Sequence, residues 1–233
     1  MRTYIFIISL LLCVVSFAQE KEETAVIEKD STKTHRFGLR VGADLSKLVK
    51  SVVIDDYTAF ELNADYKFAK KYNLAGEFGF EKRTIDETQV NFTATGNYFK
   101  IGVDYNMYVN WLDMENAIYA GFRYGLSSHK QTLNRHNIYN TDLYWEENNT
   151  INIPQEFDNN ASSWVELIFG LKAEVLQNLF LGINVQLKNK IGNNNPAGFE
   201  NLYIPGFGQT YADSNWGVGF GYTVSYFIPF YKK

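Results

Sequence analysis

Residues 217–233, GVGFGYTVSYFIPFYKK, decide the fold class of this chain. From Trp216 to Phe230, every second residue is aromatic or β-branched, and glycine, threonine or serine stands between them as far as Ser225. Successive side chains of a β-strand point to opposite faces, so a period of two is the signature of a strand. The pattern predicts one long strand over about 215–230 with an apolar face and a small, polar face.

The same period recurs along the chain from Arg36 onward. The eight predicted strands cover about residues 36–45, 57–68, 73–83, 97–109, 116–127, 163–175, 179–188 and 215–230. Short connections near 69–72, 110–115 and 176–178 alternate with long ones over about 46–56, 84–96, 128–162 and 189–214. Short turns at one end and long loops at the other are typical of outer-membrane barrels. The sequence therefore predicts an all-β fold, a transmembrane up-and-down antiparallel β-barrel of eight strands.

The apolar faces of these strands are expected to point outward, to lipid. A soluble lipocalin-like barrel would also alternate, with its apolar face inward. Aromatic residues make up 16% of the chain, and the interior of eight strands is too narrow to hold those on the apolar face. Glycines gather on the other face, where they leave room for long side chains. Eleven of the seventeen lie there, at positions 38, 42, 79, 102, 121, 125, 170, 182, 217, 219 and 221.

The polar face carries equal numbers of positive and negative charges. The basic residues are Arg36, Arg40, Lys67, Arg83, Lys100, Arg123, Lys172 and Lys188, and the acidic ones are Asp44, Glu61, Asp65, Glu77, Glu81, Asp104, Glu166 and Glu174. Unpaired ions are costly in a low-dielectric lumen, so this balance favours a lumen closed by ion pairs over an ion-selective pore. The expected ionic network consists of Arg40, Glu61, Asp65, Glu77, Lys100, Asp104, Arg123, Glu166, Lys172 and Glu174.

The first 35 residues differ from the rest in composition. Residues 1–18 have the basic start, apolar run and small-x-small end of a signal peptide, with cleavage expected between Ala18 and Gln19. Residues 19–35 are charged and without period, which predicts a flexible periplasmic leader before a barrel over residues 36–233. The single cysteine, Cys13, is expected to leave with the signal. These features predict export to the outer membrane of a Gram-negative cell.

The last strand, GVGFGYTVSYFIPFYKK, and the rhythm of turns and loops over about residues 36–231 resemble the small eight-stranded outer-membrane barrels, such as the OmpA transmembrane domain and OmpX. In style the chain is most similar to uncharacterised outer-membrane barrel families of Bacteroidota. The resemblance implies insertion by the barrel assembly machinery, which recognises a terminal strand that ends on an aromatic residue. Phe230 is the last outward aromatic here, and Tyr231, Lys232 and Lys233 follow it.

The longest loop, 128–162, is the main candidate for recognition. It combines amides and acids with aromatic residues, and Tyr144 and Trp145 are the expected binding residues for an unidentified extracellular partner or ligand. Loop 189–214 contains Gly, Asn and Pro with four aromatics and is expected to fold back on the rim. Outer-membrane lipid is the other expected partner. The net charge of −4 offers no basic footprint for nucleic acid.

Evidence for chemistry is sparse in this sequence. One combination of residues suggests a hydrolase site at the rim: a serine (Ser127 or Ser128), a histidine (His129 or His136) and an acid (Asp142 or Glu146). No spacing in the sequence holds these three groups together. Two histidines seven residues apart also define no metal geometry. We expect no catalytic residue, no metal and no cofactor. The leading interpretation is a structural or interaction barrel, with a narrow pore or small-ligand barrel, and then a lipid-acting rim enzyme, as alternatives.

Overall fold

A computed structural model describes residues 36–108, 115–137, 150–151, 153–194, 200–211 and 213–232. Nearly all of the described chain is β-strand. The elements are β1 (Arg36–Asp44), α2 (Leu45–Val53), β2 (Tyr57–Lys67), β3 (Tyr72–Asp86), β4 (Val90–Asn106), β5 (Ala117–Asn137), β6 (Thr150–Ile151), β7 (Gln155–Leu176), β8 (Leu179–Asn193), β9 (Tyr203–Ile204), β10 (Gly208–Gln209) and β11 (Trp216–Lys232).

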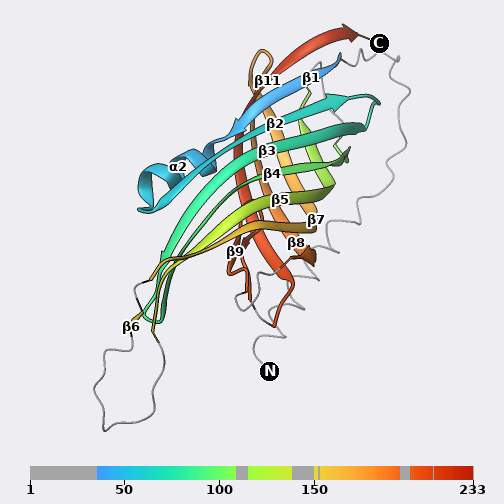
Figure 1. Cartoon of the computed structure of the whole chain (residues 1–233). Coiled ribbons are helices and arrows are strands. Elements are labelled where there is room, and N and C mark those ends of the chain that lie inside the picture. The colour runs from blue at the N-terminus through green and yellow to red at the C-terminus, as the bar shows by residue number, and fades with distance from the viewer. Residues whose placement is uncertain are drawn as a thin grey trace, which may run out of the picture. The chain divides into compact units, whose positions relative to one another are not determined.

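Eight long strands form a closed antiparallel ring (Figure 1). Each of β1, β2, β3, β4, β5, β7, β8 and β11 pairs with its neighbour in chain order, and β11 pairs with β1 to complete the ring. This is the predicted up-and-down barrel of eight strands. Every one of these strands has two antiparallel neighbours over at least part of its length, so the ring closes.

Five strands run further toward the long-loop end than the sequence predicts, among them β8, which continues to Asn193 instead of ending at residue 188. β3 and β4 continue through most of the predicted loop 84–96, and β5 and β7 occupy much of the predicted loop 128–162. β4 and β5 remain paired as far as Val90 opposite His136. The prediction was too short because Thr, Asn, Ser and Gln replace the outward apolar residues there, which removes the contrast between faces. The ladder continues regardless, since backbone groups make its hydrogen bonds.

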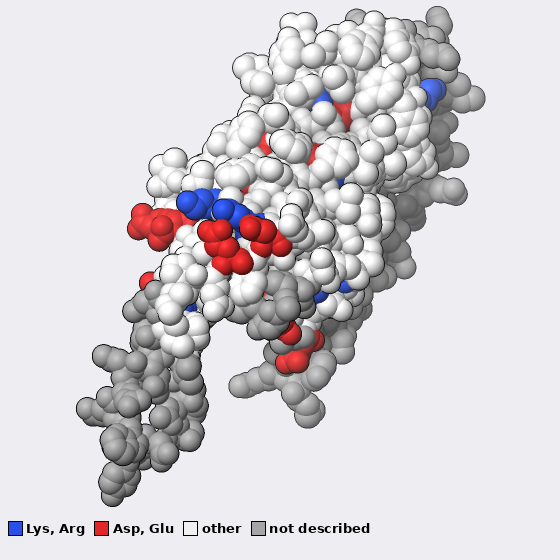
Figure 2. Space-filling view, in the orientation of Figure 1, with Lys and Arg blue, Asp and Glu red and all other residues white. Residues whose placement is uncertain are grey.

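The apolar faces point outward and the charged faces point into the ring. Phe78, Phe122, Val185 and Phe220 are exposed on the outer wall, while Lys100, Asp104 and Glu166 are about 1% exposed or less inside. Figure 2 shows that most of one face of the molecule carries no charged side chain, and that charged ones gather around α2. We call the outward apolar residues the apolar belt; its exposed large members include Phe60, Phe78, Phe122, Phe169, Val185, Val218 and Phe220.

Phe37 is an exception to the predicted alternation. The sequence places it on the outward face of the first strand, but the register of β1 against β11 shifts between Phe37 and Gly38. The extra residue of this irregularity is on β11, where Phe230 lies between the partners of Phe37 and Gly38. The Phe37 ring is buried, stacks on Tyr231 and lies under the Lys67 ammonium.

The predicted loop 46–56 contains a helix. Asp44 ends β1 and caps α2, since its carboxylate accepts a hydrogen bond from the Ser46 amide at 2.7 Å. The apolar residues of LSKLVKSVV recur at helical rather than strand spacing, and an aspartate before such a run is a helix start signal. Among the described residues, no helix is long or apolar enough to cross a membrane.

Candidate functional site

A continuous series of ion pairs crosses the lumen at the level of the apolar belt. Arg40 of β1 lies 3.2 Å from Asp65 of β2, and Asp65 also binds the Lys172 ammonium of β7 at 2.7 Å. Lys172 lies 3.6 Å from Asp104 of β4, which binds the Arg123 guanidinium of β5 at 2.7 Å. Asp65, Lys172 and Asp104 each therefore lie between two charges of opposite sign from other strands.

The series continues from Arg123 toward the long-loop end. Arg123 lies 3.3 Å from Glu77, which binds Lys100 at 2.7 Å. The Lys100 ammonium lies 3.4 Å from Glu61 and 3.8 Å from Glu166, so one lysine faces three carboxylates. Lys188 extends the series, 3.7 Å from Glu166.

We call these ten connected residues the ion chain: Arg40, Glu61, Asp65, Glu77, Lys100, Asp104, Arg123, Glu166, Lys172 and Lys188. Five are basic and five acidic, so the charges cancel. Beside Asp65, Glu77, Arg123 and Lys172 lies a cavity of about 30 Å³, room for a water molecule or two. Ion pairs from seven strands thus fill the lumen at the belt.

Nine of the ten residues that the sequence places in the network belong to the ion chain, and the tenth lies apart. Glu174 binds Arg36 at 2.6 Å near the short-turn end. Lys67 pairs with Glu115 at 2.5 Å in the same end of the barrel. Glu115 was missed by sequence reasoning because it lies in a predicted turn, outside the alternating strands.

Buried aromatic side chains share the lumen with the charges. The Tyr98 hydroxyl donates to Glu61 at 2.6 Å, and the Trp164 indole N–H donates to Glu166 at 2.7 Å. Glycines provide the space for these rings, since a Cβ at Gly79 would overlap the Tyr98 ring and one at Gly125 would overlap Trp164. The rings supply donors to carboxylates of the ion chain and fill volume that charged side chains leave open.

The loop predicted to fold back on the rim enters the barrel instead. We call residues 200–211 the plug loop. Ile204 and Phe207 pack with Tyr98 and Trp164 in one buried cluster. Gly206 has a positive φ of 82°, and a Cβ there would lie 2.5 Å from the Tyr98 ring, so only glycine fits. The plug loop thus covers the long-loop end of the ion chain.

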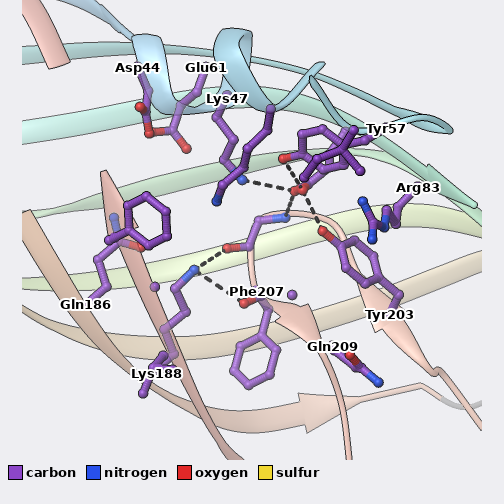
Figure 3. Close-up of a pocket in the computed structure, with 18 of the residues that line it drawn as sticks. Asp44, Lys47, Tyr57, Glu61, Arg83, Gln186, Lys188, Tyr203, Phe207 and Gln209 are labelled. Atoms are coloured by element: carbon purple, nitrogen blue, oxygen red, sulfur yellow. Dashed lines mark hydrogen bonds and ion pairs between the residues drawn. The ribbon is translucent and has the colours of Figure 1, made fainter. Parts of the chain in front are cut away.

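Glu81 of β3 is the polar anchor of the plug loop. Its carboxylate accepts hydrogen bonds from the Tyr203 hydroxyl at 2.6 Å and from the Gly206 amide at 2.9 Å. It also accepts from the Tyr57 hydroxyl at 2.7 Å, and Lys47 of α2 lies 3.3 Å away. Figure 3 shows these groups converging on one acceptor. Burial and the charge of Glu81 raise the pKa of Tyr203, so its hydroxyl stays a donor.

A cavity of about 300 Å³ lies between the plug loop, α2 and the wall of the barrel (Figure 3). We call it the mouth cavity. Its lining includes five basic residues, Lys47, Lys50, Arg83, Lys100 and Lys188, and three acidic ones, Asp44, Glu61 and Glu81. Aromatic faces from Tyr57, Phe207 and Phe220 complete the walls. The volume is at the small end of the range for ligand sites, with the mixed lining typical of them.

The residues considered for a rim hydrolase are only partly brought together. Ser127 and His129 both point inward, with the Ser127 hydroxyl 3.5 Å from His129 Nδ1. Ser127 also lies 3.4 Å from the carbonyl oxygen of Asn97, and Ser128 is exposed on the other face. His136 of β5 pairs with Val90 of β4, closer to the long-loop end than His129. Asp142 and Glu146 lie outside the described residues, so the described chain shows no acid oriented toward this histidine.

The two residues expected to bind a partner, Tyr144 and Trp145, also lie outside the described residues, as do residues 1–35, for which the sequence predicts a signal peptide and a leader. Within the described ranges, no group of three or more His, Cys, Asp and Glu side chains has the proximity that a metal ion needs.

Comparison with known proteins gives a family without an assigned function. A family model described as "Domain of unknown function (DUF6048)" matches residues 1–233. The chain belongs to this family. No curated protein matches the sequence. Among solved structures, the chain is similar to Ail, the attachment invasion locus protein of Yersinia pestis, with 9% identity over 82% of this chain and 97% of that chain and a TM-score of 0.41. The function of this DUF6048 protein must therefore be argued from its own geometry.

Proposed function

We propose that this protein is an outer-membrane β-barrel with a closed lumen, which serves as a structural or interaction barrel and presents its long-loop end to the exterior. The apolar belt supports the membrane location. It surrounds the ring, while buried charges occupy the interior, the reverse of a water-soluble barrel. An apolar surface of this extent in water is an aggregation liability, whereas lipid solvates it.

The single observation that carries the closed lumen is the ion chain. Its members are joined by distances of 2.7–3.8 Å across seven strands, and the residual cavity is about 30 Å³. A conducting pore needs a continuous aqueous path, which paired and buried side chains block. The barrel therefore supports anchoring and recognition better than transport. Outer-membrane lipid and the barrel assembly machinery are the partners that this function requires.

Two measurements test the proposal. Cell fractionation should place the protein in the outer membrane, and the purified protein in planar bilayers should show little or no current. A soluble periplasmic monomer would contradict the membrane location, and a large, steady, ion-selective current would contradict the closed lumen. Replacing residues 200–211 by a short Gly-Ser linker is the matched control. Conductance should stay low in that variant, because the ion chain lies below the plug loop.

A further inference from the structure

The wall of the barrel is incomplete beside α2. β1 ends at Asp44, opposite Thr223 of β11, and its pairing with β2 ends at Leu62. Within the described part of the chain, Tyr57–Glu61 of β2 pairs only with β3, and Trp216–Tyr222 of β11 pairs only with β8. α2 packs against both β2 and β11, so the helix lies between these two strands beyond the end of β1.

The helix presents its apolar face outward. Val52 and Val53 are 87% and 72% exposed, while Ser46 is buried and Lys47 reaches inward to Glu81. Phe60 of β2 and Phe220 of β11, on the strands that flank the helix, are also exposed on the outer wall. The outward face of α2 therefore continues the apolar belt. A helix that is polar on the protein side and apolar on the outside is suited to lipid contact.

The mouth cavity lies behind this helix and reaches both sides of the wall. Its inner lining includes Glu61 and Lys188, which belong to the ion chain. Its outer lining includes Ile54, Val218 and Phe220, which are exposed apolar residues beside α2. A molecule in this cavity would contact charged groups at one end and the apolar belt at the other.

The carboxylates of the mouth cavity are already occupied by donors of the protein. Glu81 has the four donors described above. Glu61 accepts from Tyr98 and lies beside Lys100. Asp44 accepts from the Ser46 amide at 2.7 Å and the Tyr222 amide at 3.3 Å. The three carboxylates of the lining are thus already hydrogen-bonded or ion-paired within the protein.

Two basic side chains of the mouth cavity lack a carboxylate partner among the described residues. Among the described residues, neither Lys50 nor Arg83 lies within 4.0 Å of a carboxylate, and each lies over an aromatic ring instead, Lys50 over Phe220 and Arg83 over Tyr57. Burial lowers the pKa of Lys50, and repulsion by the neighbouring charge of Lys47 lowers it further. The charges of Glu81 and Asp44 act in the opposite direction, and that of Arg83 adds a smaller lowering effect. A bound anion would relieve this repulsion between like charges.

We propose that the mouth cavity binds the anionic headgroup of an amphiphile, a carboxylate or a phosphate, whose acyl chain leaves between α2 and β11 along the apolar belt. Lys50 and Arg83 hold the headgroup, the arginine through the forked geometry that suits carboxylate and phosphate oxygens. The exposed Val218 and Phe220 contact the part of the acyl chain nearest to the headgroup. This inference rests on the proposed membrane location and adds a ligand class to it.

Native mass spectrometry of the full-length protein in a neutral maltoside detergent tests the ligand class. The anionic probes are dodecanoate and lauroyl-lysophosphatidylglycerol, the neutral control is monolauroylglycerol, and the tail-less controls are acetate and inorganic phosphate. An anionic probe should bind at least about tenfold more tightly than the neutral one, the effect of a charge-assisted contact. Preference for dodecanoate indicates a fatty acid as the source, and preference for the lysolipid indicates a phospholipid. Equal binding of the neutral or the tail-less probes would overturn the proposal.

Variants of Lys50 and Arg83 test whether these two residues hold the headgroup. The double substitution Lys50→Gln and Arg83→Gln should lower affinity for the anionic probe by about tenfold or more, whereas Lys50→Arg should retain it. The control is Lys130→Gln, which removes an exposed basic residue outside the cavity. Lys50→Gln alone is the milder variant if the double one does not fold, and unchanged affinity in it would contradict the assignment. Heat-modifiable migration reports insertion separately. Wild-type protein that inserts but binds no anionic probe overturns this inference alone, and failure of the wild type to insert overturns the membrane barrel.

Discussion

The lumen of this barrel at the level of the apolar belt differs from its mouth in how charge is used. At the belt, the ion chain gives every charge a partner of opposite sign and leaves a cavity of only about 30 Å³. At the mouth, an aromatic cluster and the plug loop fill the interior, and a cavity of about 300 Å³ remains. The charges that are paired across strands stabilise the wall. Lys50 and Arg83 beside α2 are less fully paired and are available to a ligand.

The largest effect is expected when a charge of the ion chain is removed. Arg123→Met should lower the free energy of unfolding by about 3–5 kcal/mol, because it leaves Asp104 and Glu77 buried with one cation fewer. Arg135→Met is the matched control, since the Arg135–Asp86 pair is 37% and 60% exposed and should contribute about 0–1 kcal/mol. Urea titration of the refolded barrels measures both. Equal losses would show that the ion chain is not the special element we describe.

A charge added to the outer wall tests where the belt ends. Ile183→Arg should lower the free energy of unfolding by about 2–4 kcal/mol if the position lies near the membrane midplane. Ser128→Arg, on the outward face of the β5 extension, should change it little because the side chain lies in water. Folding titrations in lipid vesicles compare the two. If both variants were as stable as wild type, the outward face of β8 would not be in lipid.

The plug loop offers a smaller, local effect. Tyr203→Phe removes one hydrogen bond to Glu81 and should lower the local stability of residues 200–211 by about 1–2 kcal/mol, with the belt unchanged. Hydrogen exchange or limited proteolysis of the loop measures this. Tyr211→Phe, at an exposed position, serves as the control. Faster exchange throughout β3 and β4 would show that the loop and the ion chain are one cooperative unit.

The smallest effect on stability is expected at the tip of the β5–β7 extension. β5 runs to Asn137 and β6 begins at Thr150, so removal of residues 138–149, including Tyr144 and Trp145, leaves the described ladder intact. The free energy of unfolding should change by less than about 0.5 kcal/mol, as for surface changes away from packed groups. Loss of a cellular partner from a correctly inserted barrel would support this tip as its binding element. Loss of insertion with the phenotype retained would exclude it.

The ring and the direction of its faces were predictable because both depend on local geometry. A period of two sets which residues share a face, whatever strand lies beside them. The eight predicted strands accordingly correspond to β1–β5, β7, β8 and β11, with errors where outward residues become polar or a bulge intervenes, as at Phe37. α2 also had a local signal, the Asp44 cap before a helical period, which the strand rhythm obscured.

The pairing of charges was not predictable in the same way. Alternation indicates that Lys172 faces the lumen, but its contacts with Asp65 and Asp104 depend on the stagger of strands far apart in the sequence. Alternation also places the aromatic donors Tyr98 and Trp164 on the lumen side of their strands. Their contacts with Glu61 and Glu166 could not be predicted from alternation.

The eight-stranded barrel, its apolar exterior and its charge-balanced interior follow from the amino-acid sequence, since local backbone geometry is enough to assign most residues to a face. Three other features became clear only in the folded protein: residues 200–211 enter the lumen, α2 continues the wall beyond the end of β1, and a cavity lies between them. Those features depend on contacts such as the one from Gly206 to Glu81, 125 residues apart. Local periodicity carries no information about such a contact, because it depends on how the ring closes and how much space the side chains inside it leave.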